Sequence, residues 1–409
     1  MKTERNFSKV YITDKAVRAL KGGHPWVFAD EITAIEGGYE NGELVDVFSA
    51  KNRYMGTGFI NDNSKIRVRV ISKNANDKFD NAFWERRVKY ALDYRKTVMG
   101  DDFKCCRLIF GEADQFPGLT VDRFGDVIVT QCLSLGIDKL KDIIFPAVIN
   151  ALRGMGEEIN VLYERNDVKI REKEGMKEYK DFYEYDGLKT DTDGKTIITE
   201  NGIKYNVDYI NGQKTGFFLD QKYNRLAAAK IAKGRKVLDC FTHTGAFALN
   251  CAYAGAEHVT AVDVSKDAVI MTEANAVLNG LEGRMDFKCA DVFELLTEMA
   301  KDGKCPYDYI ILDPPAFTKS SSTVKNAERG YKEINMKAMK LLPRGGYLAT
   351  CSCSHFMRDD LFRKMLHSAA ADANVELRQI EARQQSPDHP ILWNVPETDY
   401  LKFYIFQIV

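Results

Sequence analysis

The sequence lacks an excess of charge of either sign, because 58 Lys and Arg residues stand against 59 Asp and Glu in 409 residues. This balance excludes a strongly basic protein that binds nucleic acid mainly through bulk charge, although a local basic stripe remains compatible with RNA binding. The charged start lacks the apolar core of about 7–15 residues found in secretory signals, and no apolar run approaches the roughly 18 residues of a membrane span. We therefore expect a cytoplasmic protein without a membrane segment.

Metal-ligand spacing is also missing from the sequence. The nine cysteines include no C-x-x-C pair that recurs at the spacing of a zinc site. Reduced thiols and no bound metal are therefore expected.

The length predicts two or three domains of about 100–200 residues each. Residues 1–73 alternate short apolar runs with Gly-rich turns, which predicts a small β-rich domain. Residues 74–190 combine a helical pattern with strand-like runs, which predicts a small α+β domain. From residue 191 to 409 strands and helices alternate, which predicts an α/β domain with a doubly wound, mostly parallel sheet that ends in an antiparallel pair.

Carboxylates follow three successive predicted strands of the last domain, at Asp239, Asp263 and Asp291. In doubly wound sheets the ligand lies across the carboxyl ends of the strands. The loop after the first strand has a single glycine, Gly245, whereas NAD and FAD sites use G-x-G-x-x-G to approach a pyrophosphate. The three carboxylates favour S-adenosylmethionine (SAM), with its ammonium group at Asp239, its ribose at Asp263 and its adenine near Asp291. Singly, each is more commonly a loop or cap residue.

The next two predicted strands end at Asp313-Pro314-Pro315 and at Cys351-Ser352-Cys353. Two prolines directly after a strand fix the backbone and cannot continue the ladder, so Asp313 is expected to be held rigidly at the same edge of the sheet. The thiols are expected beside it, although a cysteine taken alone is more commonly a small buried apolar residue.

Six motifs occur in a characteristic order along the chain. They are GHPWVF (23–28), PGLTVDRF (117–124), QKTGFFLDQ (213–221), DCFTHTGAF (239–247), DPPAF (313–317) and SCS (352–354). On these motifs the chain resembles, over essentially its whole length, the bacterial large-subunit (23S) ribosomal RNA 5-methylcytosine methyltransferase I family. The resemblance implies an N-terminal PUA-type RNA-binding domain, a small central domain and a Rossmann-like class I methyltransferase domain in the cytoplasm, with a role in rRNA processing.

The resemblance also implies a set of cofactor contacts for SAM across the strand ends. Lys214, Thr215 and Phe217 would shape the entry to that site. The implied contacts themselves are Asp239, Phe241, Thr242, Gly245, Ala246, Phe247, Asp263, Val264, Asp291, Val292 and Asp313.

The resemblance also implies a chemical role for a thiol, because carbon 5 of cytosine is a poor nucleophile until a thiolate adds to carbon 6. The S-C-S pattern favours Cys353 as that nucleophile, whereas Thr350-Cys351-Ser352 resembles the T-C-S of other RNA cytosine methyltransferases, so both cysteines stay candidates. Asp313 would hold the cytosine ring at N3. Ala316 stands where many such enzymes carry a second cysteine, so adduct release works differently or uses Cys351.

RNA contacts are expected on a basic strand, where Lys65, Arg67 and Arg69 alternate with apolar residues and therefore share one face. An ordinary solvated sheet face is the alternative. Lys319 would add a phosphate contact, and Phe317 would stack on a flipped base or simply pack in the core.

Two other functions stay open on the sequence alone. One is SAM-dependent methylation of a guanine or adenine nitrogen in RNA, which needs no thiolate. The other is a non-catalytic RNA-binding assembly factor. The sequence also leaves open the target nucleotide and whether the chain forms a homodimer.

Overall fold

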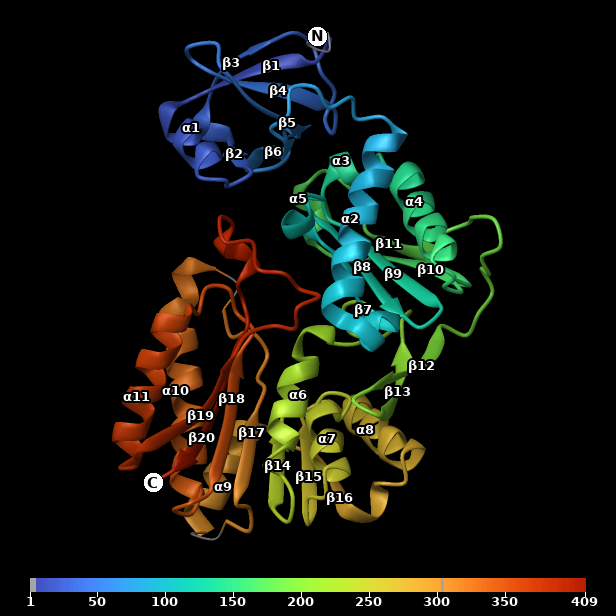
Figure 1. Cartoon of the computed structure of the whole chain (residues 1–409). Coiled ribbons are helices and arrows are strands. Elements are labelled where there is room, and N and C mark those ends of the chain that lie inside the picture. The colour runs from blue at the N-terminus through green and yellow to red at the C-terminus, as the bar shows by residue number, and fades with distance from the viewer. Residues whose placement is uncertain (1–4, 303–304, 319) are drawn as a thin grey trace. The chain divides into compact units, whose positions relative to one another are not determined.

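A computed structural model of the chain describes residues 5–302, 305–318 and 320–409 (Figure 1). The chain forms two compact units. The first comprises Met1–Thr196, Val207–Leu219 and Pro387–Thr398, and the second comprises Ile197–Asn206, Asp220–Ser386 and Asp399–Val409.

The N-terminal part of the first unit is a six-stranded sheet with the order β2-β6-β5-β4-β1-β3. Valines that alternate along the strands fill its core together with Leu20 of helix α1 (Asp14–Lys21). The sequence predicted the β-rich fold but not α1, which Thr13 caps by accepting a hydrogen bond from the backbone N–H of Ala16. The strands are β1 (Ser8–Ile12), β2 (Trp26–Phe28), β3 (Ile32–Glu36), β4 (Leu44–Ser49), β5 (Tyr54–Ile60) and β6 (Ile66–Ser72).

The rest of the first unit is built on a five-stranded sheet with the order β11-β10-β9-β8-β7. Helices α2 (Asn81–Met99) and α4 (Lys141–Gly154) pack against one another, and α2 contacts β7. Asp80 caps α2 by accepting from the backbone N–H of Phe83. The strands are β7 (Cys105–Phe110), β8 (Leu119–Phe124), β9 (Val127–Cys132), β10 (Val161–Asn166) and β11 (Tyr179–Phe182), and α3 (Leu135–Asp138) and α5 (Ile170–Lys173) are single turns.

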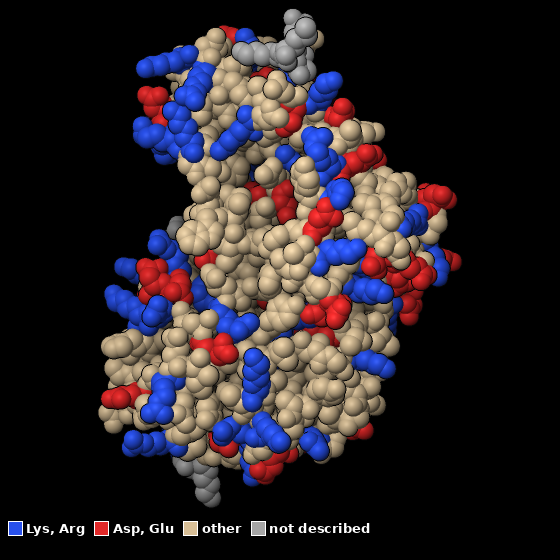
Figure 2. Space-filling view, viewed as in Figure 1, with Lys and Arg blue, Asp and Glu red and all other residues tan. Residues whose placement is uncertain are grey.

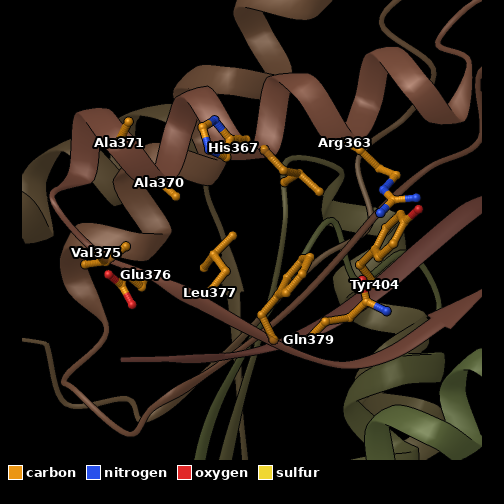
Figure 3. Close-up of a pocket in the computed structure, with 11 residues that line it drawn as sticks. Arg363, His367, Ala370, Ala371, Val375, Glu376, Leu377, Gln379 and Tyr404 are labelled. Carbon is orange, nitrogen blue, oxygen red and sulfur yellow. The ribbon is translucent and has the colours of Figure 1, made fainter.

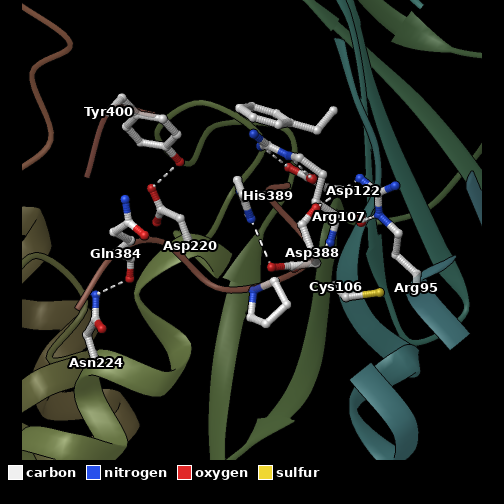
Figure 4. Close-up of polar contacts among 12 residues, drawn as sticks. Arg95, Cys106, Arg107, Asp122, Asp220, Asn224, Gln384, Asp388, His389 and Tyr400 are labelled. Carbon is white, nitrogen blue, oxygen red and sulfur yellow. Dashed lines mark hydrogen bonds and ion pairs between the residues drawn. The ribbon is translucent and has the colours of Figure 1, made fainter. Parts of the chain in front are cut away.

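A buried polar cluster joins the segment 387–398 to this sheet (Figure 4). The carboxylate of Asp388 accepts from the backbone N–H of Arg107 at 2.8 Å, and its other oxygen lies 2.9 Å from Nδ1 of His389. Arg95 donates to the Asp388 carbonyl at 3.0 Å. These hydrogen bonds give the buried polar groups partners, and they attach the segment 387–398 to the first unit although it lies far along the sequence.

The second unit contains a seven-stranded sheet with the order β16-β15-β14-β17-β18-β20-β19. The first five of these strands are parallel, and β20 is antiparallel to both β18 and β19, which confirms the predicted doubly wound sheet with an antiparallel closing pair. The strands are β14 (Lys236–Cys240), β15 (His258–Asp263), β16 (Met285–Cys289), β17 (Tyr309–Leu312), β18 (Tyr347–Ser352), β19 (Leu377–Arg383) and β20 (Lys402–Ile408).

Helices cover both faces of this sheet (Figure 1). One core cluster is shared by the strands and by α9 (Val292–Asp302), α10 (Val324–Leu341) and α11 (Asp359–Ala373). The remaining helices are α6 (Lys222–Ala229), α7 (Ala246–Tyr253) and α8 (Lys266–Leu278), and the hairpin β12 (Lys195–Glu200)–β13 (Ile203–Asp208) precedes them. Ser265 caps α8 by accepting from the backbone N–H of Ala268. Within the described part of the chain, none of the helices combines the length and apolar character needed to span a bilayer.

Candidate active site

The order in which the chain adds strands to the sheet reverses direction between β14 and β17. The chain enters the sheet at β14, continues through β15 and β16 on one side, and then crosses to β17 and β18 on the other. Ligands of doubly wound sheets bind at this switch point, outside the carboxyl ends of the strands. The loops after β14, β15, β17 and β18 are therefore the candidate site.

Asp239 lies fully buried near the end of β14. Its Oδ2 accepts hydrogen bonds from the Thr242 hydroxyl at 2.6 Å and from the backbone N–H of Ala248 at 3.0 Å. Its Oδ1 is buried and has no hydrogen-bond partner among the residues that the structure describes. Burial is the main cause that raises the Asp239 pKa to about 7. A buried carboxylate oxygen without a donor is typical of a site that a ligand completes, and it fits the ammonium group of SAM.

The loop that follows Asp239 has an unusual backbone. Phe241, His243 and Gly245 all have positive φ angles, of 64°, 51° and 82°. At Gly245 a Cβ atom would lie 2.5 Å from Cγ2 of Thr272, so the position also needs a residue without a side chain. Such conformations cluster at ligand sites, where the surrounding fold maintains them.

The carboxylates of the next two strands are engaged by backbone groups. Asp263 accepts from the backbone N–H of His243 and of Ser265, each at 2.9 Å, so it links the loops after β14 and β15. Asp291 is exposed and caps α9, because its Oδ1 accepts from the backbone N–H of Phe293 at 2.7 Å and from that of Glu294 at 3.1 Å. A cap residue was the alternative that the sequence analysis gave for Asp291. Of the neighbouring predicted contacts, Val264 is exposed, whereas Val292, Ala246 and Phe247 are buried.

Asp313, directly after β17, forms a hydrogen-bonded group with Cys351 and Gln221. Its Oδ1 accepts from the Cys351 thiol at 2.8 Å and from the Gln221 amide at 3.2 Å. Burial raises the Asp313 pKa to about 6, and burial together with the Asp313 charge raises the pKa of the Cys351 thiol. The sequence did not predict Gln221 as a site residue, although it is the last residue of the QKTGFFLDQ motif.

The two candidate cysteines differ in exposure. Cys351 lies within β18 and is fully buried. Cys353 follows the end of the strand and is partly exposed, with its Sγ 4.0 Å from the carbonyl oxygen of Pro314. Of the two, Cys353 is therefore the thiol that solvent reaches.

The predicted RNA contacts have distinct surroundings. The ring of Phe317 packs against Tyr331, with centroids 4.6 Å apart, at the edge of the core cluster. Lys319 lies outside the described residues. Lys65 is exposed, whereas Arg67 and Arg69 form ion pairs inside the first unit: Arg67 with Asp62 at 2.5 Å, and Arg69 with Glu112 at 3.3 Å and Glu174 at 2.8 Å.

Basic side chains also occur on the helix that the sequence did not predict. Lys15, Arg18 and Lys21 are exposed on α1, and Figure 2 shows Lys and Arg side chains gathered over this part of the N-terminal sheet. The spacing of three residues between them places them on one side of the helix. These cations would have been found from the sequence if Thr13 had been read as a helix cap.

The three residues expected at the cofactor entry belong to the first unit. Thr215 is buried and donates to Asp122 Oδ2 at 2.6 Å, Phe217 is buried, and the ammonium group of Lys214 lies 5.2 Å from the Phe218 ring centroid. Their role toward SAM stays a prediction.

A separate groove of about 410 Å³ runs between α11 and the β19–β20 pair (Figure 3). Its walls are mainly apolar, with Arg363 and His367 of α11 on one side and Gln379 of β19 on the other. The candidate site described above uses the ends of β14, β15, β17 and β18 instead.

Comparison with protein families gives two matches. Residues 10–73 match the PUA-like domain, and residues 177–406 match the S-adenosylmethionine-dependent methyltransferases. A methyltransferase structure from Streptococcus mutans superposes with a TM-score of 0.81 at 22% identity, covering 98% of this chain and 99% of that one. Another methyltransferase, crystallised with SAH, gives a TM-score of 0.82 at 22% identity, with the same coverage.

These matches agree with the order of the strands in the seven-stranded sheet. The fold and the site define a class I SAM-dependent methyltransferase that carries an N-terminal PUA-like domain.

Whole-length relatives define the family more narrowly. Ribosomal RNA large subunit methyltransferase I of Pseudoalteromonas atlantica is 39% identical over 404 residues, which are 98% of this chain and 100% of that protein. The enzyme of the same name from Klebsiella pneumoniae is 36% identical over 409 residues and covers both chains completely. The chain belongs to the ribosomal RNA large subunit methyltransferase I family.

Proposed function

We propose that this protein methylates carbon 5 of a cytosine in large-subunit ribosomal RNA, with Cys353 as the nucleophile. The names of the relatives support the choice of RNA. The observation that carries the chemistry is the pair of thiols at the end of β18, of which Cys353 is accessible and Cys351 is buried against Asp313.

The strand ends supply the groups that would hold SAM. Oδ1 of Asp239, which has no donor among the described residues, would accept from its ammonium group, and Asp263 would accept from its ribose hydroxyls. Asp291 would lie near its adenine. When bound, SAM supplies an electrophilic methyl group on a sulfonium.

The thiolate of Cys353 then has a defined task. Its sulfur forms a bond to carbon 6 of cytosine, the carbon 5–carbon 6 double bond opens, and the electron pair moves to carbon 5, which becomes nucleophilic. After methylation a base removes the proton from carbon 5, the double bond re-forms and the thiolate leaves.

Asp313 and Cys351 would assist this addition and its reversal. A carboxyl group with a pKa of about 6 retains a protonated fraction near neutral pH, and in that form Asp313 donates a hydrogen bond to N3 of the ring. We propose that, while the adduct is released, a proton moves between the Cys351 thiol and the Asp313 carboxylate along the hydrogen bond that joins them.

The target base has to leave any helical stack before carbon 5 can reach the methyl group, so we propose a single-stranded or flipped cytosine. Phosphate contacts would come from Lys65, from the exposed cations of α1 and, to the extent that their ion pairs open, from Arg67 and Arg69.

The test uses the full-length protein, labelled SAM and ribosomal RNA that lacks its own methyl groups, followed by mass spectrometry of the nucleosides. Labelled 5-methylcytidine is expected with the wild type and with Asp286→Asn, a control at an exposed position outside the site. Label on a purine nitrogen would replace the thiolate mechanism with nitrogen methylation. RNA binding without any transfer of label would favour an assembly factor.

A further inference from the structure

Lys402 is a buried lysine beside the two cysteines of the candidate site. It is the first residue of β20, faces Ser352 of β18 across the antiparallel ladder, and is 5% exposed. Its Nζ donates to the carbonyl oxygens of Ser354 at 2.6 Å and Tyr400 at 2.8 Å. An ammonium group has three N–H donors, so these neutral oxygens use two of them.

A cation in such a place costs free energy unless an anion compensates it. Burial lowers the Lys402 pKa to about 8. Among the charges that oppose this lowering, Cys353 acts most strongly, ahead of Asp399, Asp359 and Cys351. Geometry places the ammonium group at this cysteine, because Lys402 pairs with Ser352, the residue before Cys353, and its Nζ binds the carbonyl oxygen of Ser354, the residue after it.

The other titratable groups around this pair have partners of their own. Asp359 of α11 accepts from the Tyr404 hydroxyl at 2.5 Å, and Asp399 accepts from the Gln384 amide at 3.2 Å. Tyr331 of α10 accepts a hydrogen bond from the hydroxyl of Ser352, the residue before Cys353, at 3.0 Å, and burial raises its pKa, so it stays neutral near physiological pH. Lys402 therefore supplies positive charge to Cys353, while Tyr331 supplies none.

We propose that Lys402 is a positioning residue whose buried ammonium group holds the Cys353 thiol in its thiolate form. The S–H bond breaks, its proton passes to solvent, and the electron pair that stays on Sγ is attracted by the ammonium group. The proposal rests on the proposed function only where it treats Cys353 as the attacking thiol.

The Lys402 pKa determines how the stabilisation of the Cys353 thiolate changes with pH. Lys402 keeps its charge below a pKa of about 8, so the stabilisation of the thiolate is present at neutral pH and is lost as the pH rises through that value. An opposite charge close to a titratable group shifts its pKa by about one unit or more, so loss of the ammonium group should lower the thiolate fraction about tenfold at neutral pH.

The experiment measures alkylation of each cysteine by iodoacetamide in the full-length protein, from about pH 6 to about pH 10, with site-resolved mass spectrometry. Lys402→Met should slow alkylation of Cys353 about tenfold at neutral pH, and Lys402→Arg should restore most of the rate. Cys289, an exposed thiol on β16, is the internal control, and its rate should not change. An unchanged Cys353 rate in folded Lys402→Met protein would overturn the proposal.

The wild type gives a second readout that needs no variant. The pH midpoint of alkylation should be lower for Cys353 than for Cys289 in the same chain, and a midpoint at or above that of Cys289 would overturn the proposal. The alkylation assay does not depend on methyl transfer, so it tests the role of Lys402 separately from the proposed function. A low Cys353 midpoint together with label on a purine nitrogen would therefore refute the proposed function alone, and 5-methylcytidine together with an unshifted midpoint would refute the role of Lys402 alone.

Discussion

Replacing Asp239 with asparagine should stabilise the fold of the ligand-free protein and weaken its affinity for SAM. The carboxyl group is fully buried, and its pKa rises from an ordinary 3.8 to about 7, mainly through burial. A folded-state pKa above the unfolded value means that stability is greatest below about pH 4 and falls as the pH rises through about 7. At about 1.4 kcal/mol for each pKa unit, the buried charge costs about 4 kcal/mol above pH 7.

Asp239→Asn has nearly the same shape and no charge, so it should recover most of this free energy of unfolding at about pH 8 and very little at about pH 4. The same change replaces a charge-assisted hydrogen bond to the ammonium group of SAM, worth about 1.5–3 kcal/mol, and should raise the Kd for SAM about 10- to 150-fold. Urea unfolding at the two pH values and calorimetric titration with SAM measure both effects. Asp286→Asn, at an exposed position, is the matched control and should change the free energy of unfolding by less than about 0.5 kcal/mol.

The reasoning about Asp239 would be refuted by either of two results. One is an asparagine variant whose stability differs from that of the wild type by the same amount at both pH values. The other is an unchanged Kd for SAM, because Oδ1 of Asp239 would then not face the ammonium group.

Three further predictions concern side chains whose contacts are defined above. Gln221→Ala should lower kcat about tenfold with an unchanged Kd for SAM, because one hydrogen bond that orients Asp313 is lost; single-turnover kinetics and calorimetry separate the two. Gly245→Ala should destabilise the second unit by about 1–3 kcal/mol in urea unfolding, because its Cβ would overlap Thr272 at a positive φ. Arg69→Ala should cost about 3 kcal/mol in the same assay, because it removes the cation that pairs with both Glu112 and Glu174.

Matched variants make these results decisive. Gly280 also has a positive φ, of 65°, but a Cβ there meets nothing within 4 Å, so Gly280→Ala should cost less than Gly245→Ala. Equal costs would contradict the steric argument. For Gln221, a weaker Kd for SAM at full kcat would remove the role assigned to its amide. A stability change for Arg69→Ala below about 0.5 kcal/mol would mean that the pairs are only surface contacts.

The sequence predicted the strand ends well, because alternating strand and helix patterns fix where each parallel strand finishes. Asp239, Asp263 and Asp313 were identified in this way, as was the antiparallel pair that closes the sheet. Gln221 and Lys402 were not, because they contact the site only through the folded chain: Gln221 lies 92 positions before Asp313, and Lys402 lies 48 positions after Ser354.

Two other features show the same limit of sequence reasoning. The basic alternation at Arg67 and Arg69 predicted a shared face correctly, but it could not reveal that Glu112 and Glu174 of the first unit pair with Arg69. Helix α1 has only eight residues and lies between two strands, so the sequence interpretation assigned its segment to the β-rich pattern. The Thr13 cap, the acidic first turn and the basic last turn are the signals that mark it.

The most direct test of the central claim is covalent trapping with RNA that contains 5-fluorocytidine at the target position. Fluorine at carbon 5 cannot leave as a proton does, so a thiol adduct that has accepted the methyl group stays attached to the RNA. The account predicts a SAM-dependent covalent complex with the wild type and with Cys351→Ser, none with Cys353→Ser, and a modified peptide that contains Cys353. An adduct on Cys351, or methylated cytosine formed by Cys353→Ser protein at the wild-type rate, would contradict it.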